Sequence, residues 1–273
     1  MADDFRTGEK IIYTQDLSKS FATGDAPQQV LKGIDMEIYR GDFTVIMGNS
    51  GSGKSTLLYA LSGMDRPSMG AVTYATDEGE VRITGFDNNR LAIFRRDHVG
   101  FVFQQNYLND NMSALDNIMV VGLLKHKNRR ELAQRAKELL EKVEIGEGDH
   151  GKFPSQMSGG MQQRVAVVRG VINSPEVLFA DEPTGALNSQ NTENVLNILT
   201  DLNAEGQSIV MVTHTLAAAE RGHRIIYLAD GVISDEVVLG PYAGSYKDPE
   251  NPDREKAEER HRKLKSFLQD MGW

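Results

Sequence analysis

The sequence predicts an α/β protein with a parallel-sheet core, an antiparallel β-subdomain near the N-terminus and an inserted helical subdomain. Three short, continuous apolar runs without helical spacing predict buried parallel strands at Thr44–Met47, Val177–Ala180 and Ile209–Thr213. Alternating residues are typical of antiparallel strands at Ile11–Leu17, Val30–Ile38, Ala71–Tyr74 and Glu80–Ile83. Between Gln104 and Ser158, apolar residues recur at helical spacing among charged ones.

The first apolar run leads directly into a phosphate-binding P-loop with the pattern G-x-x-x-x-G-K-S. Its glycines let backbone N–H groups turn toward an anion, and the next helix adds the partial positive charge of its N-terminus. We expect Lys54 to reach the β- and γ-phosphates of a nucleotide and Ser55 to ligate Mg²⁺. The nucleotide-binding residues expected here are Gly48, Asn49, Ser50, Gly51, Ser52, Gly53, Lys54, Ser55 and Thr56.

The second apolar run ends at two adjacent acids, Asp181 and Glu182. In P-loop proteins a carboxylate at such a strand end holds Mg²⁺. Asp181 is therefore expected at the metal, and Glu182 as the general base for the water that attacks the γ-phosphate. Ligands of open α/β sheets lie at the carboxyl ends of strands. We therefore expect the P-loop, the two acids and His214, which follows the third run, to converge on one nucleotide.

A second anion site is expected at Ser158, Gly159 and Gly160, which precede the helix-like run Val165–Ile172. Serine is a good helix N-cap, and the free N–H groups of a helix start attract an anion. Ser-Gly-Gly alone is most often a loop, so the prediction depends on its place just before the acidic strand.

Composition bounds the possible functions. The 273 residues are 40% hydrophobic and 25% charged, which suits one domain with appendages or two small ones. A net charge of −9 argues against nucleic-acid binding. The absence of cysteine excludes disulfides and thiolate metal sites. The acidic start is unlike a secretory signal, and no run approaches the ~20 apolar residues of a membrane span, so we expect a cytoplasmic protein.

With these motifs in this order, the chain resembles the ATP-binding subunit of an ABC transporter. The resemblance covers roughly residues 11–238, which leaves an N-terminal extension at 1–10 and a charged tail with an amphipathic helix at 239–273. It implies a P-loop NTPase fold with the helical subdomain at about 105–165. It also implies that Gln104 senses Mg²⁺ and links the site to the membrane partner, and that His214 contacts the γ-phosphate. Phe21 falls where the family stacks an aromatic ring on adenine, with packing in the β-subdomain as the alternative.

The resemblance further implies ATP and Mg²⁺ as cofactors and a second copy of the chain as a partner. In that dimer the Ser158 loop of one copy caps the γ-phosphate held by Lys54 of the other. The other partner implied is a transmembrane permease, which places the protein at the inner face of the cell membrane. The segments Gly100–Gln104 and Asp181–Leu187 resemble the branch with macrolide exporters, lipoprotein-release systems, antimicrobial-peptide transporters and the cell-division ATPase.

Three positions depart from the family pattern. Met157 replaces a leucine, which is a tolerated apolar change, and Met161 replaces a glutamine. Asn188 replaces an aspartate, and this loss of charge is expected to weaken coupling between the two sites. Two other function classes stay open. An ATPase of soluble machinery, such as iron–sulfur cluster assembly, has the same architecture, whereas a small-molecule phosphotransferase leaves Ser158 and His214 unexplained. An insertion around Thr76–Gly79 has no derived role. The apolar stripe of the helix expected at Glu255–Met271 favours packing on its own domain over docking to a partner.

Overall fold

The computed structural model describes residues 8–23, 26–77 and 79–273, which divide into two compact units. Unit 1 holds the described residues of Met1–Asp87 and Val210–Trp273, and unit 2 is Asn88–Ile209. Most of the expected N-terminal extension lies outside the described residues, as does Glu78 of the expected insertion.

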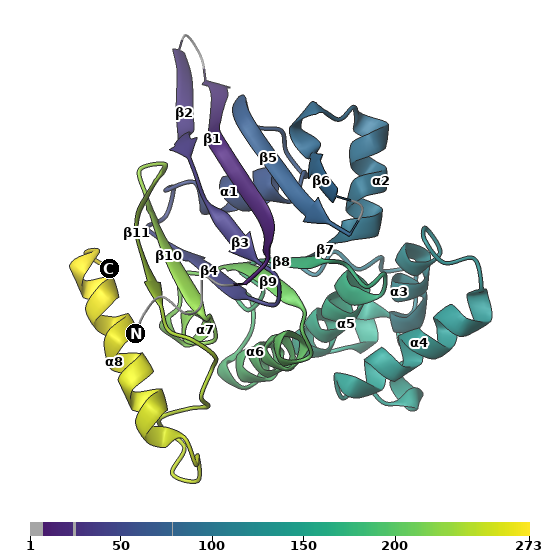
Figure 1. Cartoon of the computed structure of the whole chain (residues 1–273). Coiled ribbons are helices and arrows are strands. Elements are labelled where there is room, and N and C mark those ends of the chain that lie inside the picture. Colours follow the sequence, from purple (N-terminus) through teal and green to yellow (C-terminus); the bar gives the residue numbers. More distant parts are fainter. Residues whose placement is uncertain (1–7, 24–25, 78) are drawn as a thin grey trace. The chain divides into compact units, whose positions relative to one another are not determined.

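Unit 1 contains the predicted antiparallel sheet (Figure 1). Its strands are β1 (Lys10–Thr23), β2 (Ala26–Ile34), β3 (Glu37–Tyr39), β5 (Met69–Thr76) and β6 (Gly79–Arg82). They run in the order β2-β1-β5-β6, with β3 pairing β1. The predicted strand at Val30–Ile38 is two strands, β2 and β3. Thr14 bridges the break between them, since its hydroxyl donates to Ile34 O at 2.7 Å and accepts from Met36 N at 3.0 Å. β6 leads into a short 3₁₀ turn, η2 (Ile83–Gly85).

Unit 1 also contains the strands that precede the nucleotide motifs. β4 (Phe43–Met47) is buried throughout and pairs in parallel with β10 (Arg224–Ala229), which pairs antiparallel with β11 (Val232–Val238). Thr213 N, just after β9 (Ser208–Val212), donates to Ile46 O at 3.3 Å. These positions confirm the strands predicted from the apolar runs. The helices of unit 1 are α1 (Lys54–Leu61), α7 (Leu216–Ala219) and α8 (Arg254–Asp270).

Unit 2 pairs β7 (Val99–Phe103) in parallel with β8 (Val177–Asp181) and packs helices into a separate apolar cluster. As the helical spacing predicts, α4 (Arg129–Lys142) buries Leu132, Ala136 and Leu140 in that cluster. The other helices are α2 (Asn88–His98), α3 (Ala114–Gly122), α5 (Gly159–Val171) and α6 (Ser189–Ala204), with 3₁₀ turns η3 (Glu147–Asp149) and η4 (Pro154–Gln156).

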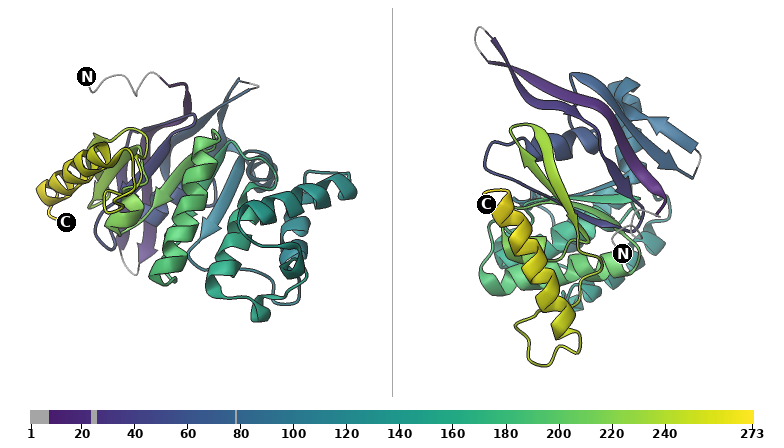
Figure 2. Two further views of the ribbon diagram at one scale, coloured as in Figure 1. Left: turned by 90° about the horizontal axis from the view of Figure 1, so that it is seen from below. Right: turned by 60° about the vertical axis from the view of Figure 1, so that its left-hand side comes forward.

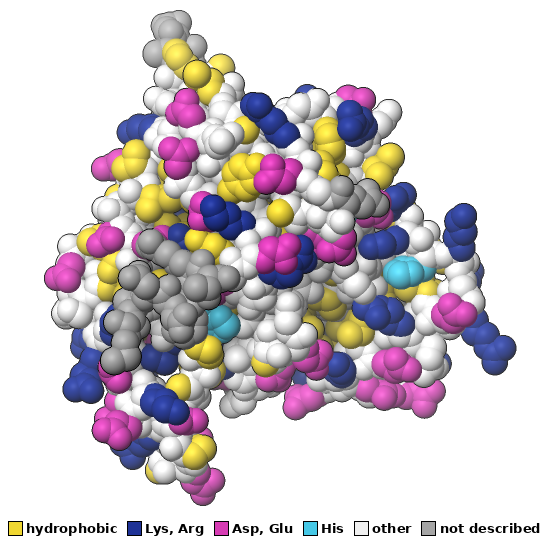
Figure 3. Space-filling view, viewed as in Figure 1, with side chains coloured by type: hydrophobic (Ala, Val, Ile, Leu, Met, Phe, Trp, Pro, Cys, Tyr) yellow, Lys and Arg dark blue, Asp and Glu magenta, His cyan; other side chains and the backbone are white. Residues whose placement is uncertain are grey.

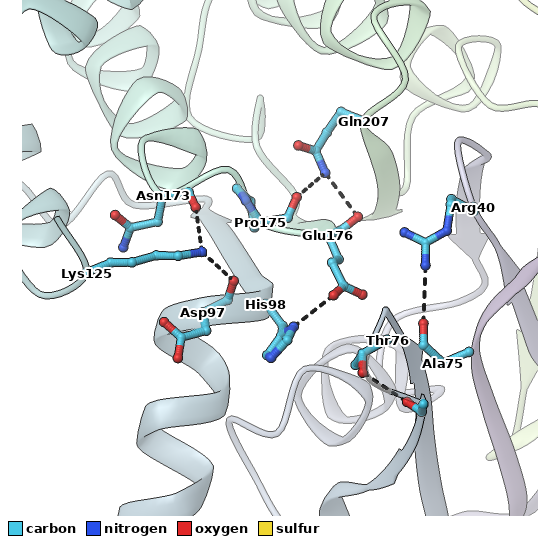
Figure 4. Close-up of polar contacts among 11 residues, drawn as sticks. Arg40, Ala75, Thr76, Asp97, His98, Lys125, Asn173, Pro175, Glu176 and Gln207 are labelled. Carbon is cyan, nitrogen blue, oxygen red and sulfur yellow. Dashed lines mark hydrogen bonds and ion pairs between the residues drawn. The ribbon is translucent and has the colours of Figure 1, made fainter. Parts of the chain in front are cut away.

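A polar network fixes the starts of β7 and β8 (Figure 4). Lys125 Nζ donates to Asp97 O at 3.0 Å and to Asn173 O at 3.1 Å. His98 Nδ1 lies 2.9 Å from Glu176 Oε1, one residue before each strand begins. These anchors hold the strand ends opposite to those that carry the predicted site.

The tail helix α8 packs on unit 1, as its apolar stripe favours. It buries Ala257, Leu264, Phe267 and Leu268, and its outer face carries side chains of both charges (Figure 3). Among the described residues, we find no helix whose length and apolar content would let it span a membrane.

Candidate functional site

The P-loop connects β4 to α1 in unit 1, as the sequence predicts. Gly48 has φ 150° and Gly53, the N-cap of α1, has φ 102°. A Cβ on Gly48 would lie 2.0 Å from Leu228 O, and one on Gly53 would lie 3.0 Å from Val30 O. Both the dihedral angles and the space therefore require glycine, and the loop turns tightly at the N-terminus of α1.

The polar groups of this loop suit a phosphate chain. Lys54, 8% exposed, donates from Nζ to Gly48 O at 2.9 Å and to Asn49 O at 2.8 Å, so its ammonium lies inside the loop. Ser52 Oγ is buried, and within the described residues it has no hydrogen-bond partner. A buried hydroxyl without a partner is costly unless a ligand or water completes it. The loop therefore fits the phosphates that the sequence predicts here.

The remaining P-loop residues lie where the motif expects them. Ser55 and Thr56 are half-buried in the first turn of α1. Asn49 accepts a 3.4 Å hydrogen bond from the buried Tyr227 hydroxyl, which ties the loop to β10. Ser50 and Gly51 form its exposed tip.

His214 is exposed at the end of β9, beside the end of β4. Thr213, the residue before it, bonds to Ile46 of β4, and Thr215 N donates to Thr213 Oγ1 at 3.1 Å. The turn into α7 therefore starts at His214. Within unit 1, the structure brings His214 and the P-loop to neighbouring strand ends.

Phe21 lies on β1 with its side chain 41% exposed, and Lys19 Nζ lies 4.9 Å from the ring centroid. Lys19 pairs with Leu31 of β2, whose side chain contacts the P-loop at Gly53. An exposed ring on this hairpin disfavours the alternative that Phe21 packs in the core, and leaves a face for stacking.

In unit 2, Gln104 and the two acids lie at neighbouring strand ends. Phe103 pairs with Asp181 in the β7–β8 ladder, so Gln104 and Glu182 leave the sheet side by side. Asp181 is 9% exposed and Gln104 is exposed. A Cβ on Gly185 would lie 2.8 Å from Gln104 Nε2, so the glutamine amide rests against the turn that follows Glu182.

Glu182 adopts a left-handed backbone conformation with φ 46°. Gly185 N donates to Glu182 O at 3.0 Å and closes the turn that holds this conformation. Non-glycine residues in this region carry strain that surrounding structure must maintain, and such residues cluster at functional sites. No sequence signal predicts this backbone angle.

Among the residues that hold the Gln104 loop, Arg169 and Gln163 carry no signal in the sequence. Arg169 of α5 donates to Asn106 O at 2.5 Å and to Tyr107 O at 2.7 Å, and burial lowers the pKa of its guanidinium. Gln163 Nε2 donates to Phe103 O at 2.8 Å. Because both side chains bind backbone carbonyls, their partners carry no mark in the sequence.

Ser158 is the N-cap of α5, as predicted, and its Oγ accepts from Met161 N at 3.3 Å. The helix begins at Gly159, before the expected run Val165–Ile172. Ser158 and Gly159 are exposed, whereas Gly160 is buried so close to α6 that a Cβ would lie 2.3 Å from Asn191 Oδ1. The exposed start of α5 thus remains accessible to an anion.

Two of the departures from the family pattern, Met161 and Asn188, have clear local structural roles. Met161 packs against the apolar cluster of α3, α4 and α5. Asn188 is the N-cap of α6, and its Oδ1 accepts from Asn191 N at 3.0 Å. Asparagine and aspartate cap helices about equally well, so the substitution keeps the start of α6.

Of the expected Mg²⁺ ligands, Gln104 and Asp181 lie together in unit 2 and Ser55 lies in unit 1. Over the described ranges, no cluster of three His, Cys, Asp or Glu side chains forms a metal site by itself. Mg²⁺ in phosphate-binding proteins usually needs only one or two carboxylates, since water and substrate phosphates supply the other ligands.

A protein-family model described as ABC transporter matches residues 31–185. The macrolide export ATP-binding/permease protein MacB of Azoarcus sp. (strain BH72) is 42% identical over 226 residues, which cover 83% of this chain and 34% of that protein. MacB of Sodalis glossinidius is 41% identical over 241 residues, which cover 85% and 35%. The chain thus spans about a third of the length of these relatives.

Solved structures with a similar fold include the dimeric MJ0796, a bacterial ABC transporter cassette, with a TM-score of 0.77 and 38% identity. That match covers 84% of this chain and 99% of the other. A dimeric post-hydrolysis state of MJ0796 bound to ADP and Pi matches with a TM-score of 0.75 and 36% identity. Both matches confirm the predicted fold class, an antiparallel β-subdomain with a mostly parallel α/β core.

Proposed function

This chain belongs to the ABC transporter family as an ATP-binding cassette that hydrolyses ATP, and from that premise we propose that two copies close around two ATP molecules and drive a transmembrane permease. The observation that carries the proposal is the P-loop of unit 1, where the Lys54 ammonium and the unpartnered Ser52 hydroxyl lie inside a glycine turn at a helix N-terminus. A phosphate chain satisfies each of these groups.

In this proposal Lys54 neutralises the β- and γ-phosphates, while Ser55, Gln104 and Asp181 hold Mg²⁺. The bound metal supplies further neutralisation of phosphate charge during phosphoryl transfer. The exposed ring of Phe21 stacks on the adenine. The Lys19 ammonium near this ring is already paired with Asp65, at 2.7 Å, and so adds no net charge.

Hydrolysis is assigned to two side chains. Glu182 accepts a proton from the attacking water, and its left-handed backbone sets the direction of the carboxylate. His214, at the strand end beside the P-loop, donates a hydrogen bond to the γ-phosphate. Both residues follow buried strands, so rigid elements position them.

The dimer completes the site. The exposed N-terminus of α5, at Ser158 and Gly159, supplies free N–H groups that cap the γ-phosphate bound to the other copy. The similar cassette MJ0796 is dimeric, which supports this pairing. A single copy then binds ATP but hydrolyses it slowly.

We assign the permease to a separate chain and this protein to the inner face of the cell membrane. The relatives named macrolide export ATP-binding/permease proteins combine both parts in one name, and the matched region covers only 34% and 35% of their length. The work driven is export of a macrolide-like compound, handling of lipids, lipoproteins or antimicrobial peptides, or mechanical movement of the permease.

Two experiments test this function. The first measures the rate of phosphate release per protein molecule over a series of protein concentrations, and this rate should rise with concentration. Sedimentation velocity over the same series should show the ATP-dependent dimer forming where the rate rises. Turnover strictly proportional to protein concentration, down to dilutions with no dimer, would contradict the shared site. Affinity capture of the full chain from detergent extracts should recover a polytopic membrane protein, whereas an iron–sulfur assembly protein in its place would contradict the permease.

A further inference from the structure

The tail helix α8 attaches to unit 1 through one buried cation as well as through its apolar stripe. Arg260 Nη1 donates to Leu239 O at 2.6 Å and to Gly240 O. Its Nη2 donates to Glu220 O at 2.9 Å and to Gly222 O at 3.0 Å. One guanidinium therefore ties two separate segments of unit 1 to the middle of α8, which runs beside them in Figure 1.

All four of these hydrogen bonds end on backbone carbonyls. Burial lowers the pKa of Arg260 to about 10, an effect that Tyr242 and Glu220 partly offset, so the side chain stays charged at neutral pH. Taking a guanidinium out of water is costly unless its donors are satisfied. The planar fork of arginine reaches carbonyls on two segments at once, which a single lysine ammonium does less well. The contact is therefore specific to arginine.

Two of the carbonyls belong to the segment that follows His214. From His214 the chain continues through Thr215 and the one-turn helix α7 to Glu220 and Gly222. The last carbonyls of a helix lack intrahelical partners, and a cation near them is stabilising. Arg260 supplies both the hydrogen bonds and the charge at this end of α7.

The same segment is fixed on its other side by β4. His223 N donates to Phe43 O at 2.8 Å. A Cβ on Gly222 would lie 2.6 Å from Val45 Cγ2, so the backbone approaches β4 closely. β4 leads into the P-loop, so the segment from Thr213 to His223 is attached at both ends to the strand that carries the loop.

Neighbouring side chains of the tail strengthen the attachment. His261 Nδ1 pairs with Glu220 Oε1, and its ring lies 4.1 Å from the ring of Tyr246. The Arg221 guanidinium lies 4.3 Å from the ring centroid of Tyr242. The tail thus contacts the segment through side chains from α8 and from the loop before it. Figure 2 shows the ribbon of α8 from two further sides.

We propose that Arg260 is a positioning residue for ATP hydrolysis, which holds α7 so that His214 stays at the γ-phosphate; this rests on the function proposed for His214. Arg260 itself touches no reacting group. The tail thereby contributes to the ATPase although it lies beyond residues 31–185, which match the family model.

The first test measures the attachment without using ATPase activity. Amide hydrogen exchange of the full chain, free of nucleotide, is compared for wild type, Arg260→Met and Arg260→Lys. Lys263→Ala is the matched control, since it also removes an α8 hydrogen bond, from Nζ to Val238 O at 2.7 Å. We expect faster exchange across residues 215–222 in both Arg260 variants and wild-type exchange there in the control. Unchanged exchange in Arg260→Lys, which keeps the charge and loses the fork, overturns the proposal even if Arg260→Met does not fold.

The second test measures transmission to the site. Both Arg260 variants should lower kcat about tenfold, while KM for ATP changes less than about twofold, because misplacing a catalytic group slows the chemical step. Combined with His214→Ala, Arg260→Lys should cause no further loss. If Arg260→Lys lowers kcat by the same factor in the His214→Ala background as in the wild type, the positioning role is overturned. A change in KM without a change in kcat overturns it as well. If the wild-type protein hydrolyses no ATP, the proposed function is contradicted. The hydrogen-exchange test then still decides whether Arg260 holds residues 215–222.

Discussion

Phe103 of β7 stands opposite Asp181 of β8 in the parallel ladder of unit 2. The next residues, Gln104 and Glu182, therefore leave neighbouring strands at one edge of the sheet. The Gln104 amide rests against Gly185, in the turn that closes onto Glu182 O. The Gln104 loop therefore reaches the turn of the proposed general base through one contact.

Replacing Glu182 by glutamine keeps the size of the side chain and removes its ability to accept a proton. We expect ATP binding to persist, turnover to fall at least about 100-fold, and an ATP-bound dimer to accumulate. Phosphate release and sedimentation velocity measure these effects. Glu205→Gln is the control, since Glu205 is an exposed acid of unit 2 paired with Lys142. Unchanged turnover in Glu182→Gln would remove Glu182 from the role of base.

Replacing Lys54 by alanine should weaken nucleotide binding itself, because Lys54 places the one ammonium that the motif directs at the phosphates. The loss of a charged hydrogen-bond donor should raise the Kd for ATP roughly 10- to 100-fold. Calorimetric titration of the full chain measures it. Lys32→Ala, which alters an exposed lysine of β2, should bind like wild type. Wild-type affinity in Lys54→Ala would mean that the phosphates bind elsewhere.

The sequence predicted those parts of the fold whose signals are local. A continuous apolar run indicated β4, and a glycine-rich motif followed by Lys54 indicated the loop and α1, because both depend on residues adjacent in the chain. The N-cap at Ser158 was predictable for the same reason.

The sequence did not predict features that depend on distant backbone atoms. β11 was missed because polar residues interrupt it, and pairing with β10 rather than composition makes it a strand. The register of Phe103 with Asp181 and the φ of Glu182 arise from tertiary packing. Arg169 and Arg260 bind carbonyls, which every residue possesses, so no residue type marks their partners.

Replacing Gly100 by alanine should destabilise unit 2. The added Cβ would lie 2.3 Å from Gly170 O and 2.8 Å from Pro175 Cγ, so α5 and β7 would have to separate. Overpacking of this kind costs about 1–3 kcal/mol of unfolding free energy. Urea unfolding of the full chain measures the change. Gly148→Ala, with nothing within 4 Å of the new Cβ, is the control. Equal stability of the two variants would contradict the close approach.

Replacing Asn188 by aspartate should preserve the start of α6, whereas alanine should weaken it. Alanine cannot accept the hydrogen bond from Asn191 N and should cost about 1 kcal/mol. Aspartate keeps that bond and places a negative charge at the helix N-terminus, which should add a few tenths of a kcal/mol. Thermal unfolding of the three proteins at one pH ranks them. A destabilised Asn188→Asp would show that the side chain does more than cap α6.

Lowering the pH should remove a small contribution of Glu37 to the stability of unit 1. Hydrogen bonds from Lys10 Nζ, 2.6 Å from Oε1, and from the Tyr39 hydroxyl, 2.7 Å from Oε2, hold the pKa of Glu37 below its ordinary value of 4.5. A carboxylate whose pKa is depressed by folding stabilises the protein above its unfolded pKa and loses that effect as pH falls through the folded value.

Glu37→Gln measures this contribution. Its deficit in unfolding free energy should stay constant from neutral pH to about pH 5 and shrink as the pH falls below 4.5. Because Lys10 is exposed, the deficit should also shrink in high salt. Lys10→Met should reduce the deficit at neutral pH, since it removes the cation of the pair. A deficit that grew on acidification would reverse the sign of the pKa shift and exclude these hydrogen bonds as its cause.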